Sequence, residues 1–202
     1  MNHNLGILIS GRGSNLQAII DAIAAGTLDA RIAIVISNKA DAGGLERART
    51  AGLETLFLSH RAFETREAYD AALVAALRAR GVGLVCLAGF MRLLSPVFVD
   101  AFPNAILNIH PALLPAFPGL DAQHQAWEHG VKVSGATVHL VDRDLDAGPI
   151  VLQRAVPVLD DDTPDALAAR ILAVEHQLYP EAIRLVLSGR WRLDGRRLVR
   201  TA

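Results

Sequence analysis

Short apolar runs alternate along this chain with stretches whose apolar positions recur every three or four residues. The apolar runs cover residues 5–10, 31–37, 54–58 and 84–88, and further runs follow at 133–141 and 150–156. Runs of this length are typical of strands, and a wholly apolar one such as 84–88 is expected in a parallel sheet covered on both faces. We therefore predict a strand at each of them.

The stretches between the runs predict helices. Leu16, Ile19, Ile20 and Ile23 share one helical face, and an amphipathic helix opens at 65–67 and ends at Gly81. Shorter helices are expected at 44–51 and 122–128, and a long one, with a kink at Pro180 left open, runs from 164 to 189. Strands that alternate with helices predict an α/β fold with a mostly parallel twisted sheet flanked by helices.

The end of the chain has a different pattern. Residues 191–199 read as two short strands around an Asp194-Gly195 turn, which is typical of a hairpin. We expect residues 1–189 to form one catalytic domain and residues 190–202 a short C-terminal tail or hairpin.

Composition narrows the class of protein. Of the 202 residues, 51% are hydrophobic and 20% charged, and the formal net charge is −1. A general nucleic-acid scaffold needs a basic field, which this balance does not give. The single cysteine, Cys86, lies in an apolar run and is expected in the core. No signal peptide or membrane span is apparent, so we expect a cytoplasmic protein with no nucleic-acid or membrane partner. A monomer and a homodimer both remain open.

A glycine-rich turn, Gly11-Arg12-Gly13-Ser14-Asn15, separates the first predicted strand from the first helix. Backbone N–H groups and the helix dipole at such a turn favour an anion, typically a phosphate. The dinucleotide fingerprint needs a third glycine, but position 16 is Leu, and no acid follows the second strand to bind a ribose. A single phosphate is therefore favoured over NAD, with a merely connecting turn as the alternative.

Residues 105–119, A-I-L-N-I-H-P-A-L-L-P-A-F-P-G, open as a buried strand that two polar side chains interrupt. Asn108 and His110 are two apart, so they point to the same face of that strand. Open α/β sheets bind ligands at the carboxyl ends of their strands. Two satisfied polar groups at a strand end are the alternative, but the pair beside three prolines favours a site.

Three other segments carry polar groups at informative places. Residues 89–94, G-F-M-R-L-L, follow a strand and suit a pocket wall, although Arg92 could equally be a surface charge. Residues 142–149, D-R-D-L-D-A-G-P, form an acidic loop that the Gly-Pro turn should make rigid, with a plain solvated loop as the alternative. Glu175 borders the apolar stripe of the last helix, where a charge is unusual unless it meets a ligand or a basic partner.

Four motifs resemble the formyltransferase family: G-R-G-S-N-L-Q-A-I, L-A-G-F-M-R-L-L-S-P, L-N-I-H-P-A-L-L-P-A-F-P-G and V-D-R-D-L-D-A-G-P-I. The likeness runs from about residue 5 to 179. It implies a Rossmann-like formyltransferase fold and a reaction without a metal. The members most similar to this chain transfer a formyl group from the co-substrate 10-formyltetrahydrofolate to the amine of glycinamide ribonucleotide.

The resemblance also implies roles for individual residues. The catalytic positions fall on Asn108, His110 and Asp146. The ribonucleotide positions fall on Gly13, Ser14, Asn15 and Glu175. The folate positions are Arg66, Met91, Arg92, Leu93, Leu94, Asn108, Asp142, Arg143, Asp144, Leu145 and Asp146. The chain departs from the family at Arg12, where some relatives carry Asn, and at Asp121, where some carry His.

The chemistry of these residues agrees with that reaction. Attack of an amine on a formyl carbon gives a tetrahedral intermediate with an anionic oxygen, to which the Asn108 amide and a protonated His110 can donate. An adjacent Asp146 would raise the pKa of His110. A bound water would relay the proton from the amine to the folate nitrogen. The other histidines, 3, 60, 124, 129, 139 and 176, are expected to be structural or at the surface.

Several rival functions remain open. Methionyl-tRNA formyltransferases share the catalytic motif but add a C-terminal RNA-binding domain, and only a short tail follows Gly189 here. Formyltetrahydrofolate hydrolases add an N-terminal regulatory domain, whereas this chain begins at its first strand. A nucleotide-binding oxidoreductase is disfavoured by the missing third glycine, and a non-catalytic ligand sensor by the intact Asn, His and Asp set.

Overall fold

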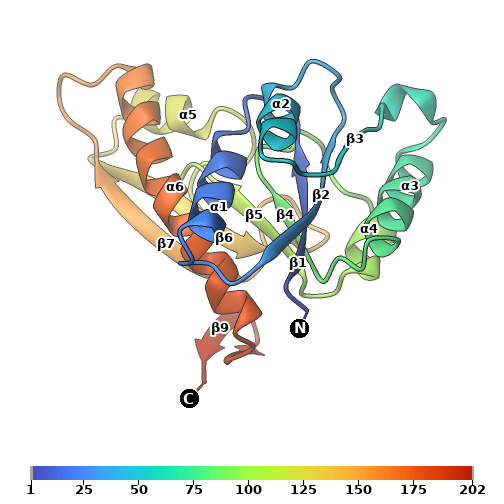
Figure 1. Cartoon of the computed structure of the whole chain (residues 1–202). Coiled ribbons are helices and arrows are strands. Elements are labelled where there is room, and N and C mark those ends of the chain that lie inside the picture. Colours follow the sequence, from blue (N-terminus) through green and yellow to red (C-terminus); the bar gives the residue numbers. More distant parts are fainter. Residues whose placement is uncertain (1, 202) are drawn as a thin grey trace.

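In the computed structural model, which describes residues 2–201, nine strands form one sheet in the order β3-β2-β1-β4-β5-β6-β7-β9-β8. The strands are β1 (Asn4–Ile9), β2 (Arg31–Ser37), β3 (Thr55–Phe57), β4 (Leu84–Leu87), β5 (Ile106–His110), β6 (Val133–Leu140), β7 (Ile150–Pro157), β8 (Trp191–Asp194) and β9 (Arg197–Arg200). Figure 1 shows this sheet crossing the molecule behind the helices.

The helices are α1 (Ser14–Ala24), α2 (Gly43–Thr50), α3 (Arg66–Arg78), α4 (Pro96–Ala101), α5 (Ala122–Glu128) and α6 (Pro164–Leu187), with a 3-10 turn at His60–Ala62. Thr65 caps α3 and Thr163 caps α6, each accepting a hydrogen bond from an N–H three residues on. The prediction of an α/β fold is confirmed. The sequence analysis missed α4 and the 3-10 turn, and α6 continues through Pro180.

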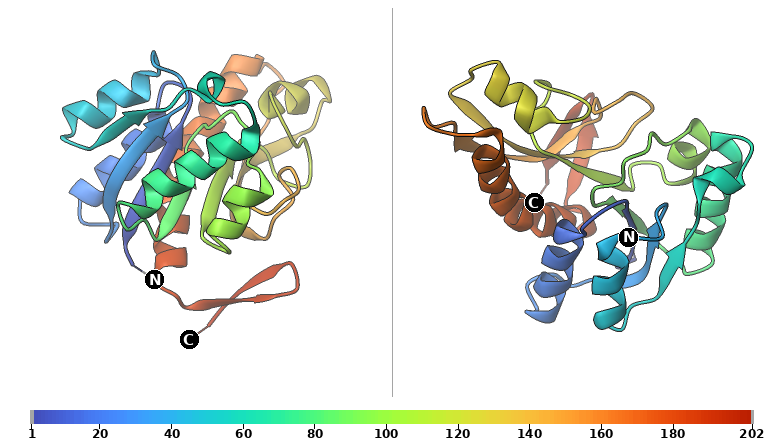
Figure 2. Two further views of the ribbon diagram at one scale, coloured as in Figure 1. Left: turned by 90° about the vertical axis from the view of Figure 1, so that its right-hand side faces the viewer. Right: turned by 90° about the horizontal axis from the view of Figure 1, so that it is seen from above.

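The first five strands are parallel, and β1 pairs with both β2 and β4. Crossovers between parallel strands are right-handed, so α1 and α2 lie on one face and α3 and α4 on the other. Helix α6 contacts α1 and therefore shares its face, as the view from above in Figure 2 shows. The chain leaves β1 in one direction and β4 in the other. A crevice at the carboxyl ends of β1 and β4 is where such sheets bind ligands.

The second half of the sheet is mostly antiparallel, with a short parallel pairing between β7 and β9. Strand β6 runs against β5 with Asn108 opposite His139 and His110 opposite Thr137, and β7 runs against β6. The sheet is therefore mixed, with its parallel part carrying the helical crossovers. The predicted hairpin is present as β8 and β9. Figure 2 shows it projecting below the body of the molecule, joined to the sheet where Arg197 pairs with Ile150.

One apolar core fills both sides of the sheet, and Cys86 is buried within it, as predicted. The Tyr179 hydroxyl of α6 lies 3.0 Å from each of two carbonyl oxygens, those of Leu87 and Leu107. This contact anchors α6 to Leu87, the last residue of β4, and to Leu107, which precedes Asn108 on β5. Because Tyr179 is fully buried, the hydroxyl would otherwise lack a partner.

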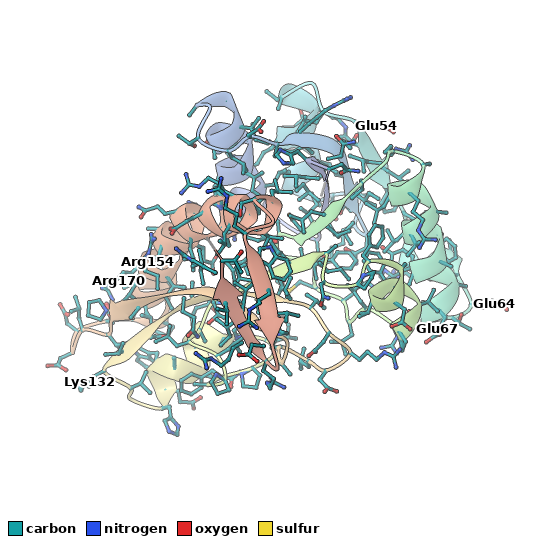
Figure 3. The ribbon with its side chains drawn as sticks, turned by 90° about the horizontal axis from the view of Figure 1, so that it is seen from below. Glu54, Glu64, Glu67, Lys132, Arg154 and Arg170 are labelled. Carbon is teal, nitrogen blue, oxygen red and sulfur yellow. The ribbon has the colours of Figure 1, made fainter. Side chains whose placement is uncertain are left out.

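The charged side chains labelled in Figure 3 lie at the periphery of the molecule. Figure 3 shows Lys132, Arg154 and Arg170 on the side of α6 and β7, and Glu54, Glu64 and Glu67 across the molecule beside α3. Arg154 pairs with Glu181 at 2.7 Å and Lys132 with Asp160 at 2.5 Å. Exposed pairs of this kind contribute little to stability. In the part of the chain the structure describes, no helix is both long and apolar enough to cross a membrane.

Candidate active site

The antiparallel register gathers three polar side chains on one face of the sheet. Asn108 and His110 are two residues apart on β5 and therefore point to the same face, and His139 lies directly opposite Asn108 on β6. Nδ1 of His139 lies 3.0 Å from the Leu140 carbonyl oxygen, so it must donate there. Nε2 of His139 is then free to accept the Asn108 amide, whose Nδ2 is 3.1 Å away. One amide hydrogen of Asn108 remains available for a ligand oxygen.

Asp146 joins this group from the loop between β6 and β7. Its Oδ2 accepts the Gly119 N–H at 2.8 Å and lies 3.4 Å from Nδ1 of His110, while its Oδ1 lies 3.7 Å from Nε2 of His139. The residue has a left-handed backbone with φ of 49°, a conformation that Asp tolerates better than most residues. The structure thus brings together the three residues that the resemblance designates as catalytic.

The charge states of Asp146 and His110 follow from their surroundings. Burial alone would raise the pKa of the Asp146 carboxyl. The imidazole of His139, the N–H of Gly119 and the imidazole of His110 outweigh burial and hold that pKa below its usual value, the two imidazoles acting when they are protonated. Burial also lowers the pKa of His110. The Phe117 carbonyl and Asp146 act in the opposite direction on His110 without reversing the shift.

The protonated His110 expected from the sequence is not the resting form of the residue. Asp146 does favour the charged form of His110, as expected, but the net pKa of His110 is lowered because desolvation is the larger effect. At neutral pH the resting imidazole is therefore neutral. Its Nε2 lies 2.8 Å from the Phe117 carbonyl oxygen and must donate to it, which leaves Nδ1 as the nitrogen that can take a proton.

A polar row across three strands holds the loop that follows His110. Thr137 donates to the Ala112 carbonyl at 2.7 Å and accepts the Leu114 N–H at 3.0 Å. Gln153, opposite Thr137 on β7, donates to Thr137 and to the Leu114 carbonyl, both at 2.9 Å. These bonds fix the backbone between His110 and the Phe117 carbonyl that orients it.

Gly148 sets the path of the loop that carries Asp146. A Cβ at this position would lie 1.8 Å from the Leu140 carbonyl oxygen, the same oxygen that receives Nδ1 of His139. Only glycine allows this approach. The loop is further tied to α4 because Arg143 contacts the Asp100 carboxylate at 2.7 and 2.9 Å.

The glycine-rich turn lies at the carboxyl end of β1. Gly13 precedes α1 with φ of 73°, and α1 has no side-chain cap and no acidic residue in its first turn. A Cβ on Gly13 would lie 2.5 Å from the Gly44 Cα, so the turn is seated directly on the start of α2. The first N–H groups of α1, from Ser14 onward, are therefore available to an anion.

Asn15 and Glu175 meet beside this turn. Nδ2 of Asn15 donates to Oε2 of Glu175 at 2.8 Å, and both side chains are buried. Burial raises the pKa of Glu175, and the Asn15 contact only partly offsets the shift. Oδ1 of Asn15 has no partner among the described residues. The structure thus joins the predicted phosphate turn to the predicted ribonucleotide glutamate.

Apart from Asn108 on β5, the residues expected to contact folate lie on three segments, which are the start of α3, the segment after β4 and the loop between β6 and β7. Met91 and Leu93 follow β4 with 62% and 55% of their surface exposed, and Leu145 of the acidic loop is 54% exposed. Solitary exposed apolar side chains are ordinary, but three that flank a polar centre suit an aromatic ligand. Leu94 is packed against the core, and Asp142 accepts the Asp144 N–H at 3.0 Å.

The two arginines of this group are placed differently. The Arg92 guanidinium lies over the Tyr69 ring, 5.5 Å from its centroid, and its buried Nε has no partner among the described residues. Arg66 begins α3 and contacts only the adjacent Glu67, at 3.7 Å, so its half-exposed side chain remains accessible. Both cations lie at the α3 side of the crevice, beside the buried carboxyl of Asp70.

His139, which the sequence predicts to be structural or at the surface, is buried, and its imidazole contacts both Asn108 and Asp146. His139 lies two residues after Thr137 on β6, so both side chains point to the same face. Only the register of β6 against β5 shows that this face also carries Asn108 and His110. Arg12 and Asp121, the two departures from the family, lie outside this polar centre, at the glycine-rich turn and just before α5. Residues 2–201 contain no cluster of three potential metal ligands.

Known proteins resemble this chain in both sequence and structure. The profile of the family described as Formyl transferase matches residues 3–183. Phosphoribosylglycinamide formyltransferase of Escherichia coli (strain K12) is 48% identical over 202 residues, which covers 96% of this chain and 95% of that protein. The solved structure of glycinamide ribonucleotide transformylase 1 from Symbiobacterium toebii has a TM-score of 0.98 and 57% identity, and the match covers 100% of this chain and 95% of that one.

Another group of relatives is much longer. The trifunctional purine biosynthetic protein adenosine-3 of Drosophila melanogaster is 50% identical over 185 residues. That match covers 91% of this chain but only 14% of the fly protein. The chain is thus similar to one part of a larger polypeptide and to nearly the whole of the bacterial protein.

Proposed function

The chain belongs to the formyl transferase family, and from this premise we propose that it transfers a formyl group from 10-formyltetrahydrofolate to the amine of glycinamide ribonucleotide, a step of de novo purine biosynthesis. One observation carries the proposal: the chain matches a phosphoribosylglycinamide formyltransferase over 96% of its own length and 95% of that protein. The polar centre of Asn108, His110 and Asp146 supports the same chemistry.

The ribonucleotide is bound first of all through its charge. Its phosphate occupies the N-terminus of α1, where the N–H groups that follow Gly13 and the helix dipole favour an anion. Glu175 receives a polar group of the same substrate. The carboxylate lies in a low-dielectric position, so a cationic or N–H donor there would be bound strongly.

The folate lies between the segment of Met91 and Leu93 and the loop of Leu145, whose apolar side chains flank its ring system. Arg66 and Arg92 are cations for its carboxylates. The chemistry needs no metal from the protein in this scheme, because formyl transfer proceeds through an anionic intermediate that hydrogen-bond donors can stabilise.

The transfer itself uses the three polar residues in turn. The substrate amine attacks the formyl carbon, and the free amide hydrogen of Asn108 donates to the oxygen as it becomes anionic. His110, neutral at rest, takes up on Nδ1 the proton that the attacking amine loses, and the imidazolium is stabilised by Asp146 and by the Phe117 carbonyl. A bound water then passes this proton from His110 to the folate nitrogen as the bond between that nitrogen and the formyl carbon breaks, which leaves the formylated product and a neutral His110.

The rival within the family is formylation of methionyl-tRNA, which would need a surface for RNA. A net charge of −1 does not favour one. We place the enzyme in the cytoplasm, acting on small molecules, with a monomer and a homodimer both compatible with the proposal.

The test is a direct comparison of acceptors. Purified protein, 10-formyltetrahydrofolate and either glycinamide ribonucleotide or initiator methionyl-tRNA are mixed, and release of tetrahydrofolate is followed by absorbance. Turnover with the ribonucleotide and none with the tRNA is expected. Equal turnover with both, or turnover with the tRNA alone, would refute the assignment, and hydrolysis without any acceptor would indicate a hydrolase.

A further inference from the structure

Ser10 lies at the point where the chain leaves β1, one residue before the glycine-rich turn begins. It is 4% exposed, and its hydroxyl has two partners on other parts of the sheet. The hydroxyl donates to Oδ1 of Asn38 at 2.6 Å and accepts the Met91 N–H at 2.9 Å. Its own N–H donates to the Gly89 carbonyl at 3.0 Å.

These contacts connect three segments at the ligand-binding edge of the sheet. Asn38 follows the last residue of β2, the segment with Gly89 and Met91 follows β4, and Gly11 follows Ser10 itself. Ser10 therefore lies across the switch point between β1 and β4, where the crevice opens. On one side of it is the turn that faces the ribonucleotide phosphate. On the other side is the segment whose exposed Met91 faces the folate.

The turn after β4 depends on Ser10 at two places. Gly89 has a left-handed backbone with φ of 77°, a conformation that glycine adopts readily. Ser10 supplies a hydrogen-bond partner on each side of Phe90: its N–H donates to the Gly89 carbonyl, and its hydroxyl accepts the Met91 N–H. On the other side, Gly11 receives the Gly44 N–H at 3.0 Å, which holds the glycine-rich turn in register with Ser10.

We propose that Ser10 is a positioning residue shared by the two half-sites, holding the ribonucleotide turn and the folate segment at a fixed separation. Loss of its hydroxyl leaves both the Met91 N–H and the side-chain Oδ1 of Asn38 without this hydrogen-bond partner. The folate segment then moves relative to the phosphate turn, and each substrate is bound less well. This inference rests on the proposed function, because it assigns one substrate to each side of Ser10.

The chain offers a matched control in Ser37. This serine also ends a strand of the same sheet and is fully buried. Its hydroxyl likewise makes two hydrogen bonds, donating to the Lys39 carbonyl at 2.8 Å and accepting the Lys39 N–H at 3.0 Å. Both contacts lie within its own turn, so Ser37→Ala removes as many hydrogen bonds as Ser10→Ala without separating two segments.

The experiment compares Ser10→Ala, Ser10→Thr and Ser37→Ala with the wild-type enzyme. The KM of each substrate, kcat and the thermal midpoint are measured, together with the Kd of glycinamide ribonucleotide by calorimetry. Ser10→Ala is expected to raise both KM values about tenfold, since buried groups on both sides lose a partner. Ser10→Thr keeps the hydroxyl and recovers most of this loss, and Ser37→Ala lowers the thermal midpoint with both KM values near wild type.

Two results would overturn the proposal. In the first, Ser10→Ala behaves as Ser37→Ala does, with reduced stability and unchanged KM values. In the second, only one of the two KM values rises, so Ser10 serves a single half-site. If Ser10→Ala does not fold, Ser10→Cys provides the same comparison at nearly equal volume. A wild-type enzyme that does not use the ribonucleotide would refute the proposed function itself, whatever the variants do.

Discussion

Asp146 places a carboxylate oxygen 3.4 Å from Nδ1 of His110, which brings a loop between β6 and β7 against the last residue of β5. The same oxygen accepts the Gly119 N–H, so the carboxylate is held by the backbone before any proton moves. Its pKa is lowered, and it remains charged at neutral pH. In the proposed mechanism this fixed charge makes the buried, neutral His110 a usable proton acceptor.

Asp146→Asn tests that relationship. The substitution removes the charge and nearly preserves the shape, so the imidazolium loses its stabilising neighbour and the pKa of His110 falls further. We expect kcat to drop by about 10²–10³, the cost typical of losing one charge-assisted partner at an oxyanion site. The Kd of the ribonucleotide should stay near normal. NMR titration of His110 and steady-state kinetics measure these changes.

The control is Asp161→Asn, which makes the same change at an exposed position outside the candidate site. It should leave both kcat and the His110 titration unchanged. A variant at Asp146 with normal turnover and an unmoved His110 titration would reduce Asp146 to a loop residue.

Ser14→Asp tests the phosphate turn. The first turn of α1 has neither a side-chain cap nor an acidic residue, which leaves its N–H groups to the ligand. A carboxylate at Ser14 would compete for them, so the KM of the ribonucleotide should rise at least tenfold while the KM of folate changes little. Ala25→Asp, which adds the same charge at the opposite end of α1, is the control. If folate binding were lost instead, the two half-sites would be assigned in the wrong order.

Gly148→Ala tests the path of the catalytic loop. Its new Cβ would lie 1.8 Å from the Leu140 carbonyl, so the loop must shift and carry Asp146 with it. A displacement of about 1 Å at a catalytic group costs on the order of 10²-fold in rate, and we expect a loss of that size in kcat. Gly43→Ala, whose Cβ would have no neighbour closer than 3.8 Å, should be active. Wild-type turnover in Gly148→Ala would show that the loop tolerates the shift.

Part of this site follows from local sequence alone. The two-residue spacing of Asn108 and His110 on a strand places both side chains on one face. Gly13, followed by a helix with no acidic residue in its first turn, favours an anion at the N-terminus of α1. The apolar runs likewise predict the parallel strands, because a strand covered on both faces has no polar face to show.

The rest depends on contacts that no local pattern encodes. His139 joins the site only through the register of β6 against β5, and Asp146 only through a loop that folds back over the sheet. The net pKa of His110 depends on burial, which is a property of the whole fold. Helix α4 was missed because it spans only six residues, and its Val97, Phe98 and Val99 do not favour a helix by propensity.

The buried carboxylate of Glu175 lowers the stability of the folded protein, whereas its proposed role in binding the ribonucleotide needs that charge. Burial raises the pKa of its carboxyl, so the folded protein holds a proton that the unfolded chain releases above its ordinary pKa of 4.5. The folded state then binds more protons than the unfolded one, and the free energy of unfolding falls as the pH rises through this range. The nearby Oδ1 of Asn15 also lacks a partner.

Glu175→Gln should therefore stabilise the free enzyme and weaken it as a catalyst. The glutamine is neutral at every pH, its oxygen can still accept from Nδ2 of Asn15, and its amide can donate to the unpartnered Oδ1, a gain of about 1 kcal/mol for one hydrogen bond. Urea unfolding should show the advantage over wild type widening from pH 5 to pH 8, while the Kd of the ribonucleotide rises because its donor loses a charged acceptor. Glu181→Gln, the same change on the same helix at a pair with Arg154, should show no such widening. A Glu175→Gln variant that is less stable than wild type by the same amount at both pH values would mean that the carboxylate is held by Asn15 rather than strained by burial.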